Sequence, residues 1–448
     1  MSSILSSPRA VLTVLVPILL AYLYGPSIRR GATVLGAFRT PENTLIASPD
    51  DIVFIDDTVH CEDVHYYAPS HSLFTACEDS EDTRFAWFPP LATFTDPALG
   101  ATARGSIHVV DPDTKKSRRL SFENFDGPFI THGIDVITDP ESKDGSAVYI
   151  FAVNHVPGQE YLDVKKGDDD NDKASKIANK AASRIEIFHH TLGSSSARHI
   201  RTVQHPLIAT PNDIVAVSPT SFYVTNDHHY REGHLRLLED VYSGATWSTV
   251  IHVRLLADSD SPAEASVAVS GLHNNNGLGH GRTPDEILVG SCCSGVLHVG
   301  TVPPPGSGEA PISLGAGAVS VDSIIDNPSY FSDPFAGYGG GGDASGFVLP
   351  GLSRAVDLQK TCRDPAAMEP IMVWYARPPV ATTEGDGAGK VDGWETRLLF
   401  EDDGERMRSA SAAVLIAIDP EKEGGKRKAW LFVTGFLSRN MIAVKVDL

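Results

Sequence analysis

Cysteine is scarce in this sequence, and the few cysteines do not form a metal-binding pattern. Five occur in 448 residues, with Cys292 and Cys293 adjacent. There is no C-x-x-C pair and no Cys/His spacing of the zinc type, which argues against a zinc site and a thioredoxin-like motif. One disulfide, joining Cys61 or Cys77 to Cys362, is compatible with an oxidising compartment, but the spacing does not fix the pairing.

Basic residues are also outnumbered. The chain has 37 Lys and Arg against 57 Asp and Glu, a formal net charge of −20. Binding to nucleic acid needs clustered cations that displace counterions from phosphates, so a nucleic-acid partner is not expected. The surplus carboxylates are either a solvated surface or ligands of divalent cations, and only their positions can separate these interpretations.

Several common catalytic signatures are missing. The sequence has no G-x-S-x-G elbow, no H-E-x-x-H pair and no glycine loop ending in Gly-Lys-Ser/Thr. These absences disfavour a serine hydrolase, a zinc peptidase and a phosphate-binding loop. No Asn-x-Ser/Thr sequon with a permitted middle residue occurs either, so glycosylation offers no clue to the compartment.

The one long apolar run lies near the N-terminus, from Ala10 to Tyr24, with Arg9 before it and Arg29 and Arg30 after it. Its roughly 15 residues fall short of the ~20 that a spanning helix needs. Residues 1–30 are therefore expected to be a signal peptide or signal anchor for the secretory pathway, with a terminal core helix as the alternative. A single domain is expected over residues 31–448.

Beyond this segment, short runs rich in Val, Ile, Phe and Tyr alternate with clusters of Gly, Pro, Asp and Asn, which is typical of strands and turns. Many short strands over some 400 residues favour a β-propeller, although no blade repeat fixes the number of blades. The clearest runs are Asp51–Ile55, Ser106–Val110, Ala147–Val153, Arg184–Phe188, Asp213–Val217, Ser221–Thr225, Thr249–Arg254, Glu286–Val289, Val296–Val299, Met372–Tyr375, Ala412–Ile418 and Ala429–Val433.

Four polar or glycine-rich segments are expected to be loops on this framework: Gly158–Ala182, Pro303–Gly317, Gly337–Gly342 and Thr382–Gly393. The first contains KKGDDDNDK, which is too polar to pack, and Lys173–Ala182 could form a short helix instead. None of these segments by itself indicates chemistry.

Four short motifs place carboxylates and amides beside strand-like runs: Cys61-Glu62-Asp63, Pro211–Val215, Asn274–Gly277 and Ile325–Pro328. Ca²⁺ takes six to eight oxygen ligands of these kinds. Any one motif alone is better explained as a turn, because Asn and Asp hydrogen-bond their own backbone. Four such motifs that converge on a propeller axis would make a calcium site.

Histidine supplies the candidate bases. His132 lies in THGID and His155 in VNH, each beside an apolar run. Histidine titrates near neutrality and can act as a general base, whereas most of the 17 histidines must be structural. The cluster of His189, His190, His228, His229 and His234 has no metal-specific spacing.

At these residues the sequence resembles the serum paraoxonase/arylesterase family. The strongest segment is HPLIATPNDIVAVSPTSFYVTNDHHY, from His205 to Tyr230, followed by a Tyr-Ser-Gly segment that ends at Trp247. The motifs THGIDVITD, YIFAVNH, NNNGLG and SIIDNPS occur along the chain in the same order as in the family.

The resemblance implies an all-β, six-bladed β-propeller with two calcium ions in a central tunnel. For the catalytic ion it implies five ligands: Glu62, Asn212, Asn276, Asp326 and Asn327. For the structural ion it implies Asp63, Asp213 and the backbone carbonyl of Ile134.

It also implies a hydrolase of lactones and aryl esters. Calcium would polarise the carbonyl, His132 would take the proton of the attacking water, and His155 would orient His132. Asp227 and His228 fall where the family has an Asp-His pair near the pocket, so they are candidates for substrate contact, with a turn as the alternative.

The sequence departs from the family in two places. The family's disulfide joins the chain ends, but no cysteine follows Cys362, so the ring must close by strand pairing or another disulfide. A glycine-rich insertion, Phe335–Gly346, follows the Asp326-Asn327 pair, and Pro328 restricts Asn327 to extended backbone.

Two other readings remain open: a non-catalytic, calcium-stabilised propeller that binds a partner or lipid, and a strictosidine-synthase-like propeller. The N-terminal segment could also contact a membrane or lipid particle.

Overall fold

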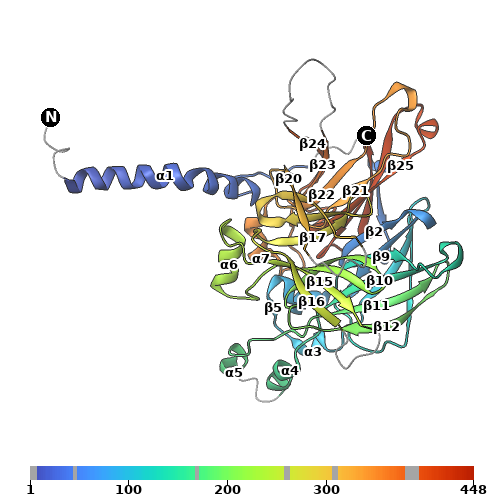
Figure 1. The fold of residues 1–448 in the computed structure, drawn as a ribbon, viewed down its shortest axis with the longest axis horizontal. Helices are drawn as coiled ribbons and strands as arrows, with labels where there is room; N and C mark the ends of the chain where they lie inside the picture. Colours follow the sequence, from blue (N-terminus) through green and yellow to red (C-terminus); the bar gives the residue numbers. More distant parts are fainter. Residues whose placement is uncertain (1–7, 44–47, 167–170, 257–262, 305–310, 379–392) are drawn as a thin grey trace.

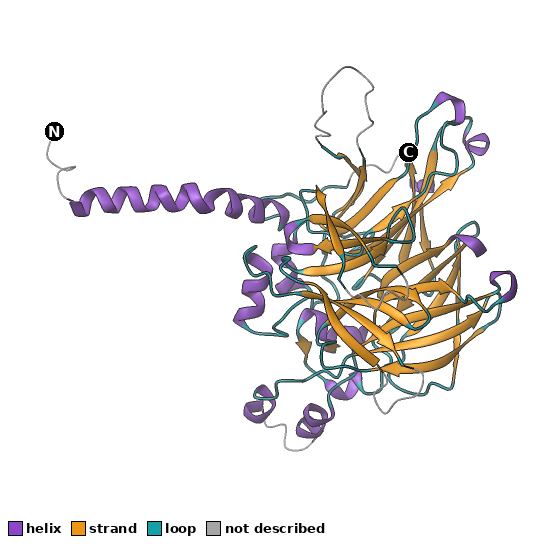
Figure 2. Ribbon diagram, viewed as in Figure 1, coloured by secondary structure: helices purple, strands orange, loops and turns teal. Residues whose placement is uncertain are grey.

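The computed structural model describes residues 8–43, 48–166, 171–256, 263–304, 311–378 and 393–448. Strands make up the body of the molecule, and helices lie at its margins (Figure 2). The strands form six sheets arranged as the blades of a β-propeller, five of them four-stranded and one five-stranded. The all-β class and the six-bladed architecture expected from the sequence are therefore confirmed.

Blades 1 to 3 follow the chain from the first cysteine to residue 269, each starting with its innermost strand. Blade 1 consists of β2 (Cys61–Tyr67), β3 (Ser72–Cys77), β6 (Ser106–Asp111) and β7 (Lys116–Arg119). Blade 2 consists of β9 (Thr131–Thr138), β10 (Ala147–Asn154), β11 (Arg184–Thr191), β12 (Ser196–Val203) and an added edge strand, β8 (Ser121–Glu123). Blade 3 consists of β13 (Pro211–Ser218), β14 (Ser221–Asn226), β15 (Thr249–Leu255) and β16 (Ala263–Val269).

Blades 4 to 6 complete the ring. Blade 4 consists of β17 (Asn275–His280), β18 (Glu286–Ser291), β19 (Val296–Thr301) and β20 (Ser313–Ser320). Blade 5 consists of β21 (Ser329–Phe331), β22 (Gly346–Leu352), β23 (Ile371–Arg377) and β24 (Glu395–Asp402). Blade 6 consists of β25 (Ala410–Ile418), β26 (Lys428–Gly435), β27 (Met441–Asp447) and β1 (Ile52–Ile55). Strands β2, β9, β13, β17, β21 and β25 line the axis, each in contact with the next.

Strand pairing closes the ring. Strand β1, from the N-terminal part of the chain, pairs antiparallel with β27, and Ile52 lies opposite Val444. The first and last strands thus share one blade, so closure needs no disulfide between the chain ends. The pairing of Cys61 or Cys77 with Cys362 was wrong: Cys61 bonds to Cys77 and joins β2 to β3, and Cys362 is free.

Most strands are buried on both faces because each blade lies between two others. In β26, Leu431 and Val433 belong to a core cluster shared with Val373 of blade 5, while Phe432 belongs to a cluster shared with Leu73 of blade 1. Two-sided burial explains why these strands have nearly continuous apolar sequences. Burial of apolar area contributes about 25 cal/mol per Å², and it is the main stabilising term of the ring.

The N-terminal run forms helix α1 (Pro8–Val34), which projects away from the strands (Figure 1). Described side chains along it, such as Tyr22 and Ile28, are largely exposed, which does not fit a core helix. Its C-terminal end is docked: Val34 is buried, and Arg30 donates hydrogen bonds to the carbonyls of Ser294 and Val321. None of the helices in the described ranges is long and apolar enough to span a bilayer.

Short helices lie in the connections between the strands. They are α2 (Glu81–Ala86), α3 (Pro97–Gly100), α4 (Gln159–Lys166), α5 (Asn171–Ser175), α6 (His234–Val241) and α7 (Leu358–Thr361), together with a small ribbon of β4 (Trp87–Phe88) and β5 (Thr93–Phe94). The polar segment at 158–182 is thus partly helical, at α4 and α5, and α5 overlaps the predicted piece 173–182 only at residues 173–175. Residues 167–170, 305–310 and 382–392 of the expected loops lie outside the described residues.

Candidate active site

The first residues of the inner strands meet at one end of the axis. Glu62 and Asp63 lie at the start of β2, His132 at the start of β9, and Asn212 and Asp213 at the start of β13. Asn276 belongs to β17, and Asp326 and Asn327 directly precede β21. The four oxygen-rich motifs, more than 260 residues apart at their extremes, are therefore brought together, as the 3.1 Å hydrogen bond from Asn327 Nδ2 to Glu62 Oε1 demonstrates.

Five side chains at this end each keep one buried oxygen without a hydrogen-bond partner in the protein. The atoms are Glu62 Oε2, Asn212 Oδ1, Asn276 Oδ1, Asp326 Oδ1 and Asn327 Oδ1. These residues, called here the five-oxygen cluster, coincide with the five for which the sequence predicted a catalytic calcium. A buried acceptor without a partner costs about 1–3 kcal/mol, so a gathering of five needs a compensating ligand.

The carboxylates in this region repel one another. Burial, with Asp326 and Asp63 nearby, raises the pKa of Glu62 well above its usual value. Burial, with Asp63 and Asp227 nearby, does the same to the pKa of Asp326. A cation among these oxygens would favour their charged forms and offset the repulsion.

The donor types fit a hard cation. Carboxylates and amide carbonyls are the oxygen ligands that Ca²⁺ takes, whereas zinc prefers nitrogen and sulfur. Within the described residues, no group of three or more His, Cys, Asp or Glu side chains is arranged to hold a metal ion. The five-oxygen cluster is not such a group, because it contains two carboxylates and three amides.

The residues predicted to bind a structural ion, unlike the five-oxygen cluster, already have hydrogen-bond partners for their carboxylates. Asp63 accepts hydrogen bonds from the backbone N–H of Val64 and Ile134, at 2.7 and 2.9 Å. Asp213 accepts them from Ile214 and Leu278, both at 2.7 Å. All four carboxylate oxygens therefore already have partners, and Ile134 contributes its N–H to Asp63. Burial raises the pKa of Asp63 to about 6, and burial together with Asp63 and Glu62 raises that of Asp213.

Glycine permits the close approach of these strands. A Cβ on Gly133 would lie 2.5 Å from Asp213 Oδ1, and one on Gly277 would lie 2.4 Å from the Cα of Asn327. Contacts this short do not occur for real side chains, so both positions require glycine. In the THG and NNG sequences, a predicted site residue is thus followed by a glycine that leaves space for the neighbouring strand.

The two predicted histidines form a hydrogen-bonded pair beside the cluster. His132 Nδ1 lies 3.1 Å from His155 Nε2, and His155 Nδ1 lies 2.9 Å from Ser183 Oγ. His132 Nε2 faces the cluster, 3.9 Å from Glu62 Oε1, which is too long for a direct hydrogen bond. Burial lowers the pKa of His132 to about 3 and that of His155 well below its usual value, so both rings are neutral near pH 7.

Aromatic and cationic residues that sequence reasoning missed support this pair. The ring of Phe88 contacts that of His132 edge-on, with centroids 5.4 Å apart, and the Arg84 guanidinium lies 3.9 Å from the centre of Phe88. The indole N–H of Trp87 donates to the backbone carbonyl of His155 at 2.7 Å. All three come from the α2–β4 segment, whose sequence RFAWF carries no catalytic pattern.

The Asp227–His228 pair lies in the same region. His228 Nδ1 is 3.2 Å from Asp227 Oδ2, and its Nε2 is 2.7 Å from Asp240 Oδ1 of α6. Burial and Arg236 lower the pKa of His228, but the two carboxylates outweigh them and raise it to about 9. His228 is therefore an imidazolium near pH 7, and it ties α6 to the end of β14. The role of Asp240 was not foreseen from the sequence.

A cavity of about 310 Å³ lies over this end of the axis. Its floor includes His132, Asn212, Asn276 and Asp326, and its apolar wall includes Phe88. The remaining apolar lining comes from helices and loops above the blades, among them Leu35, Leu237, Val241, Val356 and Phe436. The two predicted substrate contacts, Asp227 and His228, both line this cavity.

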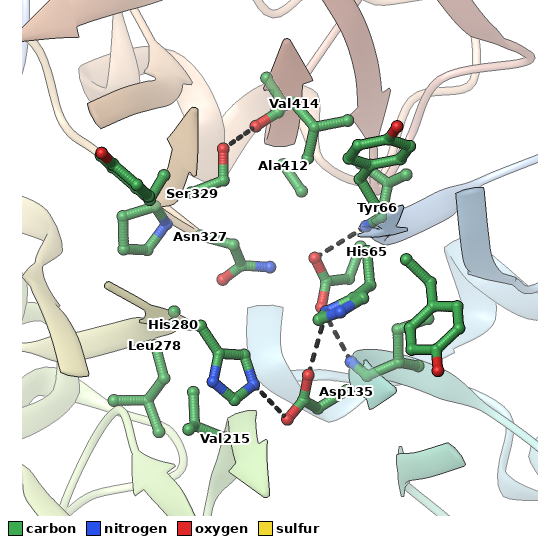
Figure 3. A pocket seen from close by; sticks show the side chains of 18 of the residues that line it. His65, Tyr66, Asp135, Val215, Leu278, His280, Asn327, Ser329, Ala412 and Val414 are labelled. Carbon is green, nitrogen blue, oxygen red and sulfur yellow. Dashed lines mark hydrogen bonds and ion pairs between the residues drawn. The ribbon is translucent and has the colours of Figure 1, made fainter. Parts of the chain in front are cut away.

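A second cavity, of about 320 Å³, lies at the other end of the axis, where the later residues of the inner strands gather (Figure 3). There Asp135 binds two histidines, at 3.0 Å from His65 Nδ1 and 2.8 Å from His280 Nε2. The carboxylate also accepts the backbone N–H groups of Val136 and Ala216. Asp135 therefore links four inner strands across the axis, in a cavity that Asn327 of the five-oxygen cluster also lines.

Part of the chain is similar in sequence to known proteins. Residues 169–302 match the sequence profile of the Arylesterase family. The chain is 32% identical over 200 residues to serum paraoxonase/arylesterase 2 of Gallus gallus, covering 44% of this chain and 46% of the relative. It is 27% identical over 213 residues to serum paraoxonase/arylesterase 1 of Homo sapiens, covering 47% of this chain and 50% of the relative.

Over part of its length, this chain is similar to proteins of the paraoxonase/arylesterase family. It spans about half the length of the curated relatives that it matches. The Arylesterase match contains β13 and β17, and so includes Asn212, Asp213, Asn276, Asp227 and His228. Glu62, His132, His155 and Asp326 lie outside it and reach the site through the closure of the propeller.

Solved structures resemble the chain more remotely. A luciferin-regenerating enzyme is 11% identical, with a TM-score of 0.41 over 87% of this chain and 92% of that chain. A periplasmic gluconolactonase of Pseudomonas aeruginosa is 10% identical, with a TM-score of 0.36 over 86% of this chain and 85% of that chain. At these identities and TM-scores, the two structures give no information on the function of this chain.

Proposed function

We propose that the protein hydrolyses small lactones and aryl esters and that it depends on calcium to do so. The observation that carries this proposal is the five-oxygen cluster with its five unpaired oxygens. Three of its residues, Asn212, Asn276 and Asp326, line the cavity together with His132, which is hydrogen-bonded to His155 behind it. Similarity to paraoxonase/arylesterase proteins supports ester or lactone hydrolysis as the reaction class.

Glu62, Asn212, Asn276, Asp326 and Asn327 would hold the catalytic ion. Bound there, calcium supplies a Lewis acid that polarises an ester carbonyl and stabilises negative charge on its oxygen. The two carboxylates would balance the charge of Ca²⁺, and the three amides are neutral. The occupied site would therefore be close to neutral overall. The paired charges of Glu62 and Asp326 would bind the ion, and the amides would complete its oxygen shell.

His132 would act as the general base. Its pKa of about 3 keeps the ring neutral near pH 7. In the tautomer whose Nδ1–H donates to His155, Nε2 is the free base, and this atom lies 3.9 Å from Glu62 Oε1 of the five-oxygen cluster. A water that attacks a carbonyl above the cluster would lose its proton to Nε2. His155 would hold the ring of His132 through its Nδ1, and Ser183 would fix His155 in turn. Phe88 and Arg84 would limit rotation of the His132 ring.

The cavity suits a small, mostly apolar substrate. Its volume of about 310 Å³ lies at the lower end of the range for ligand pockets. Phe88, Leu237 and Val356 would contact the alkyl or aryl part of the substrate, while Asp227 and His228 would lie beside its polar part. A small lactone or phenyl ester has one apolar part and one polar part and would match these two sides of the cavity.

A second, structural ion at Asp63, Asp213 and the carbonyl of Ile134 is also proposed. Burial, with Asp63 and Glu62 nearby, raises the pKa of Asp213, and a cation there would offset this effect. The support is narrower than for the catalytic ion, because the four carboxylate oxygens already accept backbone hydrogen bonds.

Residues 1–30 are proposed to direct the chain to the secretory pathway, with residues 31–448 as one propeller domain on the lumenal or extracellular side. The exposed apolar side chains of α1, such as Leu23 and Ile28, would suit contact with a membrane or lipid particle.

Hydrolysis of a panel of γ- and δ-lactones and of phenyl acetate tests the proposal. The purified full chain is assayed with calcium, after chelation with EDTA, and after calcium is restored. We expect turnover that disappears on chelation and returns with calcium. Absence of turnover in a folded sample that binds calcium would instead support a non-catalytic, calcium-stabilised propeller.

A further inference from the structure

Two adjacent cysteines lie on the wall of the candidate active-site cavity. Cys292 and Cys293 open a short 3-10 turn, Cys292–Ser294, between β18 and β19. Both residues line the cavity together with Asn276 and Asp326, and neither takes part in the Cys61–Cys77 disulfide. The proposed hydrolysis gives them no role.

The two thiols contact each other. Cys292 and Cys293 are joined by a side-chain hydrogen bond, which together with burial raises the pKa of the Cys292 thiol. Cys292 is buried with 6% of its surface exposed, and Cys293 is more exposed. The pair thus presents two neighbouring thiols at the cavity wall, one of them accessible.

Geometry disfavours oxidation of this pair to a disulfide. None of the described peptide bonds is cis, and consecutive Cα atoms across a trans peptide are about 3.8 Å apart. A disulfide between adjacent residues closes an eight-membered ring that contains this trans peptide bond, so forming it would distort the turn. A single atom that bridges both sulfurs avoids the direct S–S bond and relaxes this restriction.

We propose that Cys292 and Cys293 form a dithiol site for a thiophilic trivalent arsenical that enters from the cavity. Soft thiolate ligands select soft, thiophilic centres over hard cations such as Ca²⁺, so this site is chemically distinct from the five-oxygen cluster. With an organoarsenic oxide, two S–H bonds break and two As–S bonds form. The oxygen leaves as water with both protons, and arsenic stays trivalent, so the step needs no oxidant.

Occupation of the site would disturb the cluster beside it. The backbone N–H of Cys292 donates to the Asn274 carbonyl at 3.0 Å, and the N–H of Cys293 donates to Asn274 Oδ1 at 3.3 Å. The N–H of Ile325 donates to the Cys292 carbonyl at 3.4 Å. The turn is thus bonded to the segments that carry Asn276 and Asp326. Loss of turnover on occupation rests on the proposed function, whereas the binding itself does not.

Phenylarsine oxide, added to the full chain with the Cys61–Cys77 disulfide intact, tests the site by intact-protein mass spectrometry. We expect one phenylarsenic adduct per chain that survives excess monothiol and is removed by 2,3-dimercaptopropanol. The C292S and C293S variants should lose this adduct. The C362S variant is the matched control, because Cys362 is a free, buried cysteine that does not line the cavity, and it should keep the adduct.

A second measurement covers the case in which a variant does not fold. In the wild-type chain the arsenical should protect Cys292 and Cys293 from alkylation by iodoacetamide, as read by peptide mapping. No adduct on the wild-type chain, or an adduct that remains in the C292S/C293S double variant, overturns the proposal.

Turnover of phenyl acetate is measured on the same samples. Loss of turnover at full occupancy, reversed by the dithiol, is the expected result, and unchanged turnover would overturn the effect on the cluster. A wild-type chain that never turns over substrate contradicts the proposed function but leaves the binding result decisive for this site.

Discussion

His132 Nδ1 lies 3.1 Å from His155 Nε2, although the two histidines are separated by 23 residues and lie at the ends of different strands of blade 2. His132 is the second residue of β9, and His155 directly follows β10. Because β9 and β10 pair antiparallel, with Asn154 opposite Thr131, the end of one strand meets the start of the other. The hairpin itself therefore sets the contact between the two rings.

Replacing the proposed base should remove most of the turnover. In His132→Gln the side chain can still hydrogen-bond but cannot accept a proton at neutral pH, so kcat for phenyl acetate should fall by about 10²–10⁴-fold. His190→Gln is the matched control, because His190 is equally buried but bonds to the Ser196 carbonyl in the outer part of blade 2. Near-normal kcat in His132→Gln would exclude this histidine as the base.

Removing one amide of the five-oxygen cluster should weaken calcium binding. Asn276→Ala deletes an unpaired buried oxygen, so we expect calcium affinity, measured by isothermal titration, to fall by at least about tenfold. Asn226→Ala is the control, because Asn226 Oδ1 accepts the backbone N–H groups of Ala209 and Thr210. That variant should lower the Tm and leave calcium affinity unchanged. Equal affinities in wild type and Asn276→Ala would contradict the assignment.

Ring closure should depend on one face of β1. Ile55 is fully buried in the cluster between blades 6 and 1, and Ile55→Ala should lower the free energy of unfolding by about 2–5 kcal/mol. Its neighbour Phe54 is 48% exposed, and Phe54→Ala should change the free energy by under about 0.5 kcal/mol. Guanidinium denaturation compares the two variants. Equal effects would show that β1 adds nothing specific to closure.

Stability should depend on pH through His228. Its folded pKa of about 9 exceeds the ordinary value of 6.5, so the native state keeps a proton that the unfolded chain releases. The stability from this imidazolium is fully present below pH 6.5 and is lost as pH rises through about 9. At about 1.4 kcal/mol per pKa unit it amounts to roughly 3 kcal/mol at most.

His228→Gln should therefore destabilise the protein most near pH 6 and least above about pH 9. Urea denaturation of wild type and variant at both values measures the difference. A difference in unfolding free energy that stays constant, or grows, with rising pH would show that His228 is not held as a cation between Asp227 and Asp240.

Most of the middle strands could be predicted from the sequence because they are buried on both faces. Ala147–Val153 and Ala429–Val433, for example, are continuous apolar runs, and they became β10 and β26. The more exposed outer strands β7, β12 and β16 were not among the predicted runs. Of the inner strands, β13 and β25 were predicted, but β2, β9, β17 and β21 were not. They begin with, or directly follow, polar residues that face the axis, and β9 and β17 contain glycines needed for close approach, so their hydrophobic pattern is interrupted.

Residue chemistry alone determined which oxygens and rings this protein has to offer: carboxylates and amides in four motifs, and two histidines beside apolar runs. Only the tertiary structure decided that they meet, because closure by β1 and β27 brings segments from both halves of the chain to one end of the axis. It also decided the disulfide, since Cys61 and Cys77 are opposite each other in a hairpin register that spacing does not reveal. The roles of Arg84, Phe88 and Asp240 depend on contacts over long sequence distances, which local patterns do not encode.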